Sequence, residues 1–133
     1  MRRLLIAAPL LLLAADPALA QGKVWEKGKV LTCTVTTMHS CKEQNCETQQ
    51  ITAEVRLDLD TKKACIVQSG NCTDTEDIGP TKVVDRVFIL FIGPEKEDGT
   101  LFRIWDDGRF TAVGLREISG EGGYVMLGTC AAK

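Results

Sequence analysis

The sequence predicts an all-β domain, an antiparallel meander of about seven strands that closes into a small, disulfide-stabilised barrel. Three observations predict it. Apolar and polar residues alternate along several segments, short turn sequences separate these segments, and the chain has six cysteines. Short sequential connections favour antiparallel neighbours, and closure into a barrel would remove the exposed sheet edges. A two-sheet sandwich is the alternative.

Residues 1–20 have the features of a secretory signal peptide. Two arginines precede an apolar run over residues 4–15, and residues 18–20 match the small-residue pattern that signal peptidases cut. The run is shorter than the roughly 20 apolar residues that a spanning helix needs. We therefore expect cleavage before Gln21, no membrane span after cleavage, a single β domain over residues 21–133, and a periplasmic or secreted location.

The charge of the chain argues against nucleic acid as a partner. The formal net charge is −2, and the 16 basic residues are interspersed with the 18 acidic ones. Nucleic-acid-binding proteins usually present a basic patch, and this sequence has no block of basic residues from which to build one.

The six cysteines are expected to form disulfides, because small exported domains fold in an oxidising compartment. Six cysteines allow 15 pairings. We favour two local pairs and one long pair that fastens the first strand beside the last: Cys41–Cys46, Cys65–Cys72 and Cys33–Cys130. The long pair would stabilise the fold by about 4–5 kcal/mol, because it closes the longest loop in the unfolded chain.

The first two strands are expected over residues 30–38 and 51–59. The first is rich in β-branched residues, and its odd-numbered residues from Leu31 to Val35 are expected to face inward. In the second, apolar residues alternate strictly with polar ones, so one face lies in the core and the other in water. Residues 41–50 are polar throughout, which predicts a loop or a single turn.

The middle of the chain is expected to contain a strand at 63–68 and then a loop that carries the acidic run 74–77. The strongest apolar run lies at 83–92 and ends at Gly93-Pro94. Its β-branched and aromatic residues favour a central strand covered on both faces. If one face is not covered, it would be a partner surface or the wall of a site for a lipid-like ligand.

The last strands are expected at 101–106, 109–118 and 122–129. Asp-Gly favours a two-residue type I′ hairpin turn, because that turn needs positive φ at both positions. Asp107-Gly108 would therefore set two cross-strand pairs: Trp105–Phe110 and Asp106–Arg109.

The candidate binding residues are aromatic: Trp25, Trp105, Phe110 and Tyr124. Large aromatic rings are enriched at interfaces and ligand sites. Packing in the core or at the rim is the simpler explanation for each of them. Trp25, which precedes the first strand, is a candidate cap for one end of the barrel.

No catalytic motif appears, and we expect a protein that is not an enzyme. The chain has one histidine, His39, and nothing matches a nucleophile elbow. A metal-binding alternative rests on His39 with Cys33, Cys41 and Cys46, whose thiolates and imidazole suit zinc or copper. The 74–77 run lacks the spacing of a calcium loop. Disulfide formation would remove the thiolates, so we expect no metal and no cofactor.

Short motifs give two resemblances to known families. The N-terminal cysteine cluster together with the terminal Gly128-Thr129-Cys130 resembles small exported cysteine-containing bacterial β proteins of unknown function, which implies no activity. The segment from Ser119-Gly120 to Tyr124 resembles the Ser-Gly-x-x-Tyr motif of periplasmic lysozyme inhibitors, which are small exported β-barrels. It is one residue longer than that motif. The second resemblance implies that the chain enters the cleft of a lysozyme.

Together these observations predict a soluble, non-enzymatic binding or structural protein of the periplasm or the medium. Its partner would be an envelope protein or a small apolar ligand. The alternatives are an inhibitor of lysozyme or another hydrolase, and a metal-binding envelope protein. A cavity inside the barrel would favour small-molecule binding, whereas a filled barrel would favour recognition at the surface.

Overall fold

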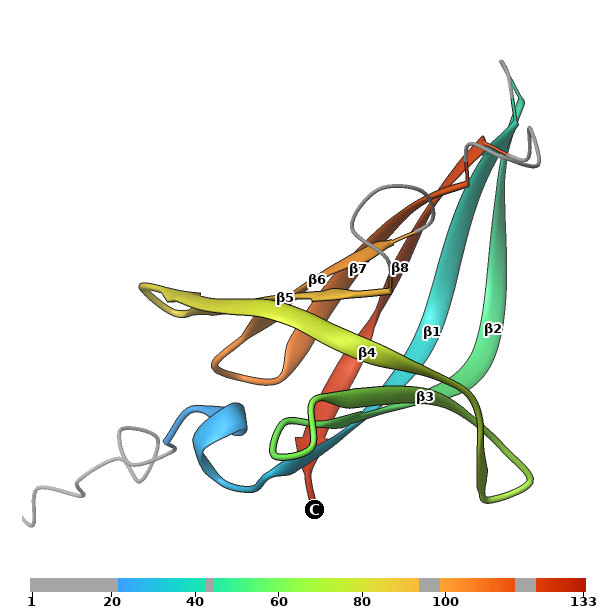
Figure 1. Ribbon diagram of the computed structural model, residues 1–133. Coiled ribbons are helices and arrows are strands. Elements are labelled where there is room, and N and C mark those ends of the chain that lie inside the picture. The colour runs from blue at the N-terminus through green and yellow to red at the C-terminus, as the bar shows by residue number, and fades with distance from the viewer. Residues whose placement is uncertain (1–21, 43–44, 94–98, 117–121) are drawn as a thin grey trace, which may run out of the picture.

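The computed structural model describes residues 22–42, 45–93, 99–116 and 122–133 (Figure 1). Eight antiparallel strands form a closed barrel in chain order, which confirms the all-β meander and excludes the sandwich. The predicted signal peptide lies outside the described residues. The strands are β1 (Val30–Lys42), β2 (Asn45–Asp58), β3 (Lys63–Gln68), β4 (Asn71–Val84), β5 (Val87–Ile92), β6 (Thr100–Trp105), β7 (Arg109–Arg116) and β8 (Gly122–Ala132).

The barrel closes where the first strand pairs with the last. β1 is hydrogen-bonded to β2 on one side and to β8 on the other. Cys33 lies opposite Cys130 in the β1–β8 register, and a disulfide joins the two side chains. The other disulfides are Cys41–Cys46 and Cys65–Cys72, so the structure contains the three pairs favoured from the sequence.

The eighth strand is β4, where the sequence led us to expect a loop. The acidic run 74–77 lies within β4, and Val83 and Val84 end this strand instead of beginning β5. The register of β4 shifts against β3 and again against β5. Each shift places one extra residue on β4 and changes which of its side chains face inward. The sequence of β4 therefore has no sustained alternation of apolar and polar residues.

Residues 41–42 and 45–50 of the polar segment are also strand, so the loop or single turn predicted there is wrong. β1 and β2 continue as a hairpin up to the pair Lys42–Asn45, with Cys41 opposite Cys46. In Figure 1 this hairpin extends beyond β3, whereas β8 runs alongside β1 as far as Cys41. Most residues of this part of β2 are exposed, which explains why the segment needs no apolar face.

A bulge in β1 decides which side chains enter the barrel. Leu31, Cys33 and Val35 are fully buried, as predicted. On β8 the partners of Val35 and Thr37 are the consecutive residues Gly128 and Leu127, so Thr36 is extra on β1. One extra residue exchanges the two faces of a strand. Beyond the bulge, even-numbered residues therefore face inward.

The apolar strand β5 is covered on one face only, which corrects the prediction of a fully covered central strand. Phe88, Leu90 and Ile92 are buried, whereas the residues that alternate with them, Val87, Ile89 and Phe91, are partly exposed. The reason is that the sheet closes into a single barrel, so each strand has an inner face and a solvent face.

The turn between β6 and β7 has three residues rather than two. Ile104 lies opposite Phe110, so Trp105 is not the partner of Phe110. The backbone N–H of Gly108 donates to the carbonyl oxygen of Trp105 at 2.9 Å, and Gly108 has φ +91°. Positive φ at the last loop residue alone is typical of a type I turn followed by a bulge.

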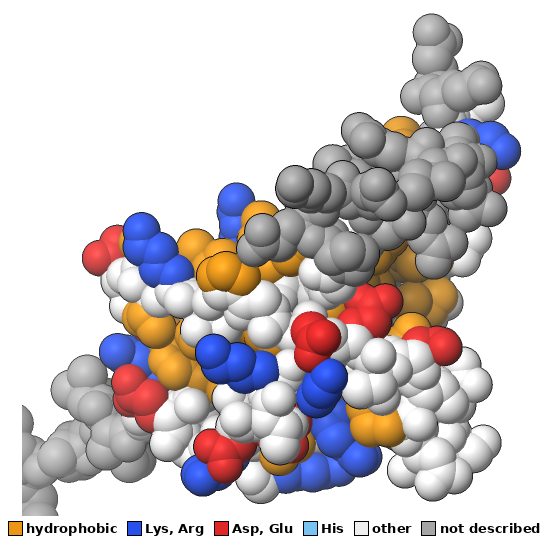
Figure 2. Space-filling model, in the orientation of Figure 1, with side chains coloured by type: hydrophobic (Ala, Val, Ile, Leu, Met, Phe, Trp, Pro, Cys, Tyr) orange, Lys and Arg blue, Asp and Glu red, His pale blue; other side chains and the backbone are white. Residues whose placement is uncertain are grey.

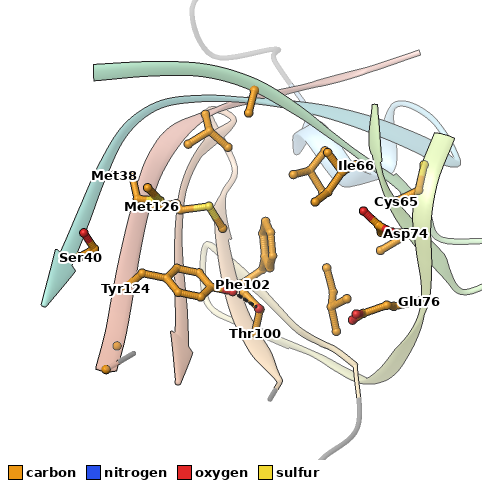
Figure 3. A pocket seen from close by; sticks show the side chains of 17 residues that line it. Met38, Ser40, Cys65, Ile66, Asp74, Glu76, Thr100, Phe102, Tyr124 and Met126 are labelled. Carbon is orange, nitrogen blue, oxygen red and sulfur yellow. Dashed lines mark hydrogen bonds between the residues drawn. The ribbon is translucent and has the colours of Figure 1, made fainter. Parts of the chain in front are cut away.

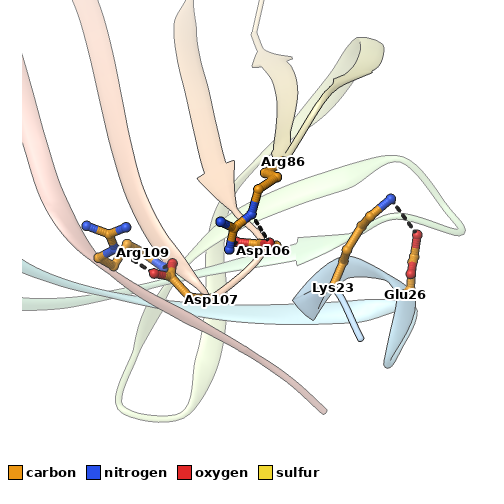
Figure 4. A network of polar contacts seen from close by, with 6 residues as sticks. All are labelled: Lys23, Glu26, Arg86, Asp106, Asp107 and Arg109. Atoms are coloured by element: carbon orange, nitrogen blue, oxygen red, sulfur yellow. Dashed lines mark hydrogen bonds and ion pairs between the residues drawn. The ribbon is translucent and has the colours of Figure 1, made fainter. Parts of the chain in front are cut away.

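The ion pairs of this turn also differ from the sequence prediction. Asp106 binds Arg86 through two hydrogen bonds of 2.5 and 3.0 Å, and Arg109 binds Asp107 at 2.7 Å (Figure 4). In the wider turn Asp106 is no longer opposite Arg109. It instead accepts hydrogen bonds from Arg86, which lies in the turn between β4 and β5.

One end of the barrel is closed by a short 3-10 helix, η2 (Val24–Glu26). The backbone N–H of Val24 donates to the carbonyl oxygen of Asp106 at 3.2 Å, and the Trp25 ring stacks on Phe88 with 5.6 Å between centroids. Within the described ranges, no helix is long and apolar enough to cross a membrane.

The core lies between this closed end and the middle of the barrel. Its largest side chains are 0–2 % exposed and come from β1, β2, β5, β6 and β7: Leu31, Val35, Leu57, Leu90, Phe102, Ile104 and Phe110. The rings of Phe102 and Phe110 stack at 5.6 Å. Dense packing at this level leaves the opposite end of the barrel as the place for a site.

Removing the long disulfide should destabilise the barrel more than removing the hairpin disulfide. We expect Cys33→Ala with Cys130→Ala to lower the free energy of unfolding by about 4–5 kcal/mol, and Cys41→Ala with Cys46→Ala by about 2 kcal/mol, because loop closure costs more entropy in a longer loop. Urea unfolding of the two double variants and the parent measures this. Equal losses in the two variants would contradict the closure role of Cys33–Cys130.

Candidate functional site

The end of the barrel opposite η2 contains a cavity of about 740 Å³ (Figure 3). Its floor is the top of the core, where Val35 and Phe102 lie. Its walls come from β1, β2 and β8 on one side and from β3 and β4 on the other. The cavity is therefore built by the same inward faces that form the core below it.

The β1–β8 wall carries two methionines. Met38 and Met126 are direct cross-strand partners, and both line the cavity. The bulge at Thr36 turns Met38 and Ser40 inward, and His39 therefore points away from the cavity. Methionine is flexible and polarisable, so this wall can adapt to the shape of a bound apolar group.

Tyr124 spans part of the cavity toward β6. Its hydroxyl and that of Thr100 lie 2.7 Å apart and share a hydrogen bond. Tyr124 is opposite Gly114 in the register, and any Cβ at Gly114 would collide with the Tyr124 ring. Glycine at position 114 thus allows the ring to lie across β7.

The opposite wall is the more polar one. Ile66 on β3 lines the cavity and is 42 % exposed, and beside it β4 contributes Asp74 and Glu76. Asp74 has φ +49°, in the left-handed region that aspartate and asparagine enter more readily than most residues. It lies where two residues of β4, 74 and 75, oppose the single residue Cys65 of β3. Such bulges re-aim side chains.

The described lining contains two carboxylates and no lysine, arginine or histidine. The remaining polar side chains are the hydroxyls of Ser40, Thr100 and Tyr124. On the face of the molecule that Figure 2 shows, by contrast, acidic and basic side chains are interspersed. The cavity therefore has a charge character that the surrounding surface does not share.

The closed end has a polar network around the turn between β6 and β7. The side-chain hydrogen bonds from Arg86 hold the pKa of Asp106 below its usual value, and the backbone N–H of Arg109 does the same for the pKa of Asp107. These groups lie at the surface and stabilise the turn on which Val24 rests. None of them is among the described residues that line the cavity.

The four aromatic residues predicted as binding residues lie in different places. Tyr124 lines the cavity. Trp25 covers the closed end, Phe110 is buried in the core, and Trp105 lies on the outer face of β6 opposite Val87 of β5. The structure thus brings only Tyr124 of the four to the cavity.

The metal-binding alternative loses its thiolate ligands, since Cys33, Cys41 and Cys46 are all in disulfides. Nδ1 of His39 lies 2.8 Å from the hydroxyl of Thr48 on the outside of the β1–β2 hairpin. In the part of the chain that the structure describes, no three His, Cys, Asp or Glu side chains are grouped to hold a metal ion.

The segment that resembles the lysozyme-inhibitor motif is described only from Gly122 onward. Its tyrosine, Tyr124, faces the cavity rather than the outside of the barrel. Ser119 and Gly120 lie outside the described residues, so inhibition of lysozyme stays a prediction.

Comparisons with protein-family models, with curated proteins and with solved structures found no match. The case for a function therefore rests on the cavity itself.

Sequence reasoning missed most of the cavity residues. One signal was present: Cys130 faces inward, so the period of two along β8 also points Met126 and Tyr124 inward. Met38 could not be found in this way because the bulge at Thr36 reverses the alternation. Glu76 was missed because its segment was expected to be a loop.

The hydrogen bond between Tyr124 and Thr100 should be measurable by a double-mutant cycle. Tyr124→Phe and Thr100→Val should each lower the free energy of unfolding by about 1 kcal/mol, because each leaves a partly buried hydroxyl without its partner. The double variant should lose less than the sum, because both single changes remove the same bond. Urea unfolding of the four proteins tests this, and additive losses would show that the two hydroxyls do not interact.

Proposed function

We propose that this protein binds a small, mainly apolar molecule in the cavity at the open end of the barrel. The observation that carries the proposal is an apolar-floored cavity of about 740 Å³ above a filled core. Small-molecule sites usually have volumes of about 300–1,000 Å³ and combine apolar walls with a few polar groups. The cavity meets both criteria.

The closed end makes the cavity a cup rather than a channel. Trp25 and Phe88 cover one end, and the stacked Phe102 and Phe110 fill the middle. A ligand that enters at the open end therefore meets the floor near Phe102 and Val35. Burial of an apolar group against this floor contributes roughly 25 cal/mol for each Å² removed from water.

We propose that the protein binds its ligand without catalysing a reaction. The hydroxyls that line the cavity would need a neighbouring base to act as nucleophiles. His39 is the only histidine of the chain, and it lies on the other face of β1, beside Thr48. The carboxylates of the cavity, Asp74 and Glu76, lie on the wall opposite Tyr124 (Figure 3). The protein is therefore proposed to carry or sense its ligand and to leave it unchanged.

We place this function in the periplasm or outside the cell. Three disulfides fit an oxidising compartment. Residues 1–20 support the same location through the arginine pair, the apolar run and the cleavage pattern of a signal peptide.

A cavity-filling substitution should abolish binding, whereas the same substitution on the outer face should not. Ala53 lines the cavity from β2, and the preceding residue, Thr52, is exposed on the other face of that strand. Ala53→Trp fills the space that the ligand needs. The neutral fluorophore N-phenyl-1-naphthylamine serves as the probe, because its emission rises in apolar surroundings.

We expect the parent and Thr52→Trp to bind the fluorophore with similar affinity, and Ala53→Trp to bind it at least about tenfold more weakly. Circular dichroism confirms that both variants are folded. If the parent does not bind the fluorophore, or if Ala53→Trp binds it as well as Thr52→Trp does, the cavity is not the binding site.

A further inference from the structure

We propose that the ligand is an amphipathic organic cation, with an apolar part on the cavity floor and a positively charged group beside Asp74 and Glu76. This inference rests on the proposed binding function and adds the chemical class of the ligand. It follows from how polar and apolar side chains are divided within the cavity.

The floor and most of the β1–β8 wall are apolar. Val35, Phe102 and Ile92 lie toward the core, and the paired Met38 and Met126 continue this surface toward the mouth. The hydroxyls of Tyr124 and Thr100 are already hydrogen-bonded to one another. This side of the cavity therefore suits a hydrocarbon group better than a polar one.

The carboxylates lie together on the opposite wall (Figure 3). Asp74 and Glu76 come from one strand, and both line the cavity. A Cβ at Gly93, just after β5, would lie 2.7 Å from Oε2 of Glu76, so this carboxylate sits against the rim between β4 and β5. Both acids are exposed, which places a bound charge near water at the mouth.

The neighbouring acid, Asp77, shows how the inner carboxylates differ from those outside. Asp77 pairs with Lys63 of β3 at 2.6 Å on the outside of the barrel. Inside, the described lining provides no basic side chain to match Asp74 or Glu76. A ligand with a positive charge would pair with these carboxylates, whereas an anionic ligand would be repelled by them.

Three probes with the same hydrocarbon chain test the charge preference: octylammonium, octanol and octanoate. Each is titrated as a competitor against N-phenyl-1-naphthylamine bound to the full mature protein at neutral pH. We expect octylammonium to bind about tenfold more tightly than octanol, and octanoate to bind most weakly. Because the carboxylates are exposed, the difference in affinity between octylammonium and octanol should decrease at high ionic strength.

Two double variants, each of which removes two carboxylates, test whether the inner carboxylates cause the preference for octylammonium. Asp74→Asn with Glu76→Gln removes the two inner carboxylates, and we expect it to abolish the preference for octylammonium while octanol binds as in the parent. Asp77→Asn with Glu54→Gln removes two carboxylates outside the cavity, and we expect it to keep the preference.

The possible failures are distinguishable. If octanol competes but octylammonium binds no more tightly than octanol, or if the outer double variant loses the preference as fully as the inner one, the cationic ligand is excluded and the binding function stands. If none of the three compounds displaces the fluorophore, the cationic ligand is likewise excluded, whereas the proposed function fails only if the parent does not bind the fluorophore or if Ala53→Trp binds it as well as Thr52→Trp does.

Discussion

The pairing of β1 with β8 is the contact on which the rest of the structure depends. It joins segments that are 97 residues apart at the Cys33–Cys130 disulfide, and it converts a meander with two free edges into a barrel with an inside. The inside then serves two purposes. One half is filled by the core, and the other half is left as the cavity. Without closure neither half would be enclosed.

The division between core and cavity depends on the bulge at Thr36. Below it, β1 supplies small and branched side chains that pack tightly, such as Val35. Above it, the same strand directs Met38 and Ser40 inward while His39 faces out. The chain beyond this level also has glycines at positions 122 and 123 in the cavity lining, which add little volume. Packing density therefore falls toward the open end, and a site becomes possible there.

The sequence predicted the parts of the fold that obey a simple period. Ile51 to Leu59 alternate without interruption, and this strand was found with the correct inner face. β4 was missed because two register shifts break its alternation, and the turn after Trp105 was misjudged because Asp-Gly also fits a three-residue loop in which Gly108 alone needs positive φ. Of the cavity, only Tyr124 was foreseen. Whether a small barrel is filled or hollow depends on how side chains from all its strands pack together. A local sequence pattern does not predict this packing.

A hollow open end can be tested directly by nuclear magnetic resonance. Met38 and Met126 are the only methionines after Met1, and both line the cavity, whereas the two tryptophans lie at the closed end and on the outer face. Upon titration with octanol, we expect both methionine methyl signals to shift along one saturable curve while the indole N–H signals of Trp25 and Trp105 stay in place. Stationary methyl signals, or indole signals that shift instead, would contradict a binding cavity at this end of the barrel.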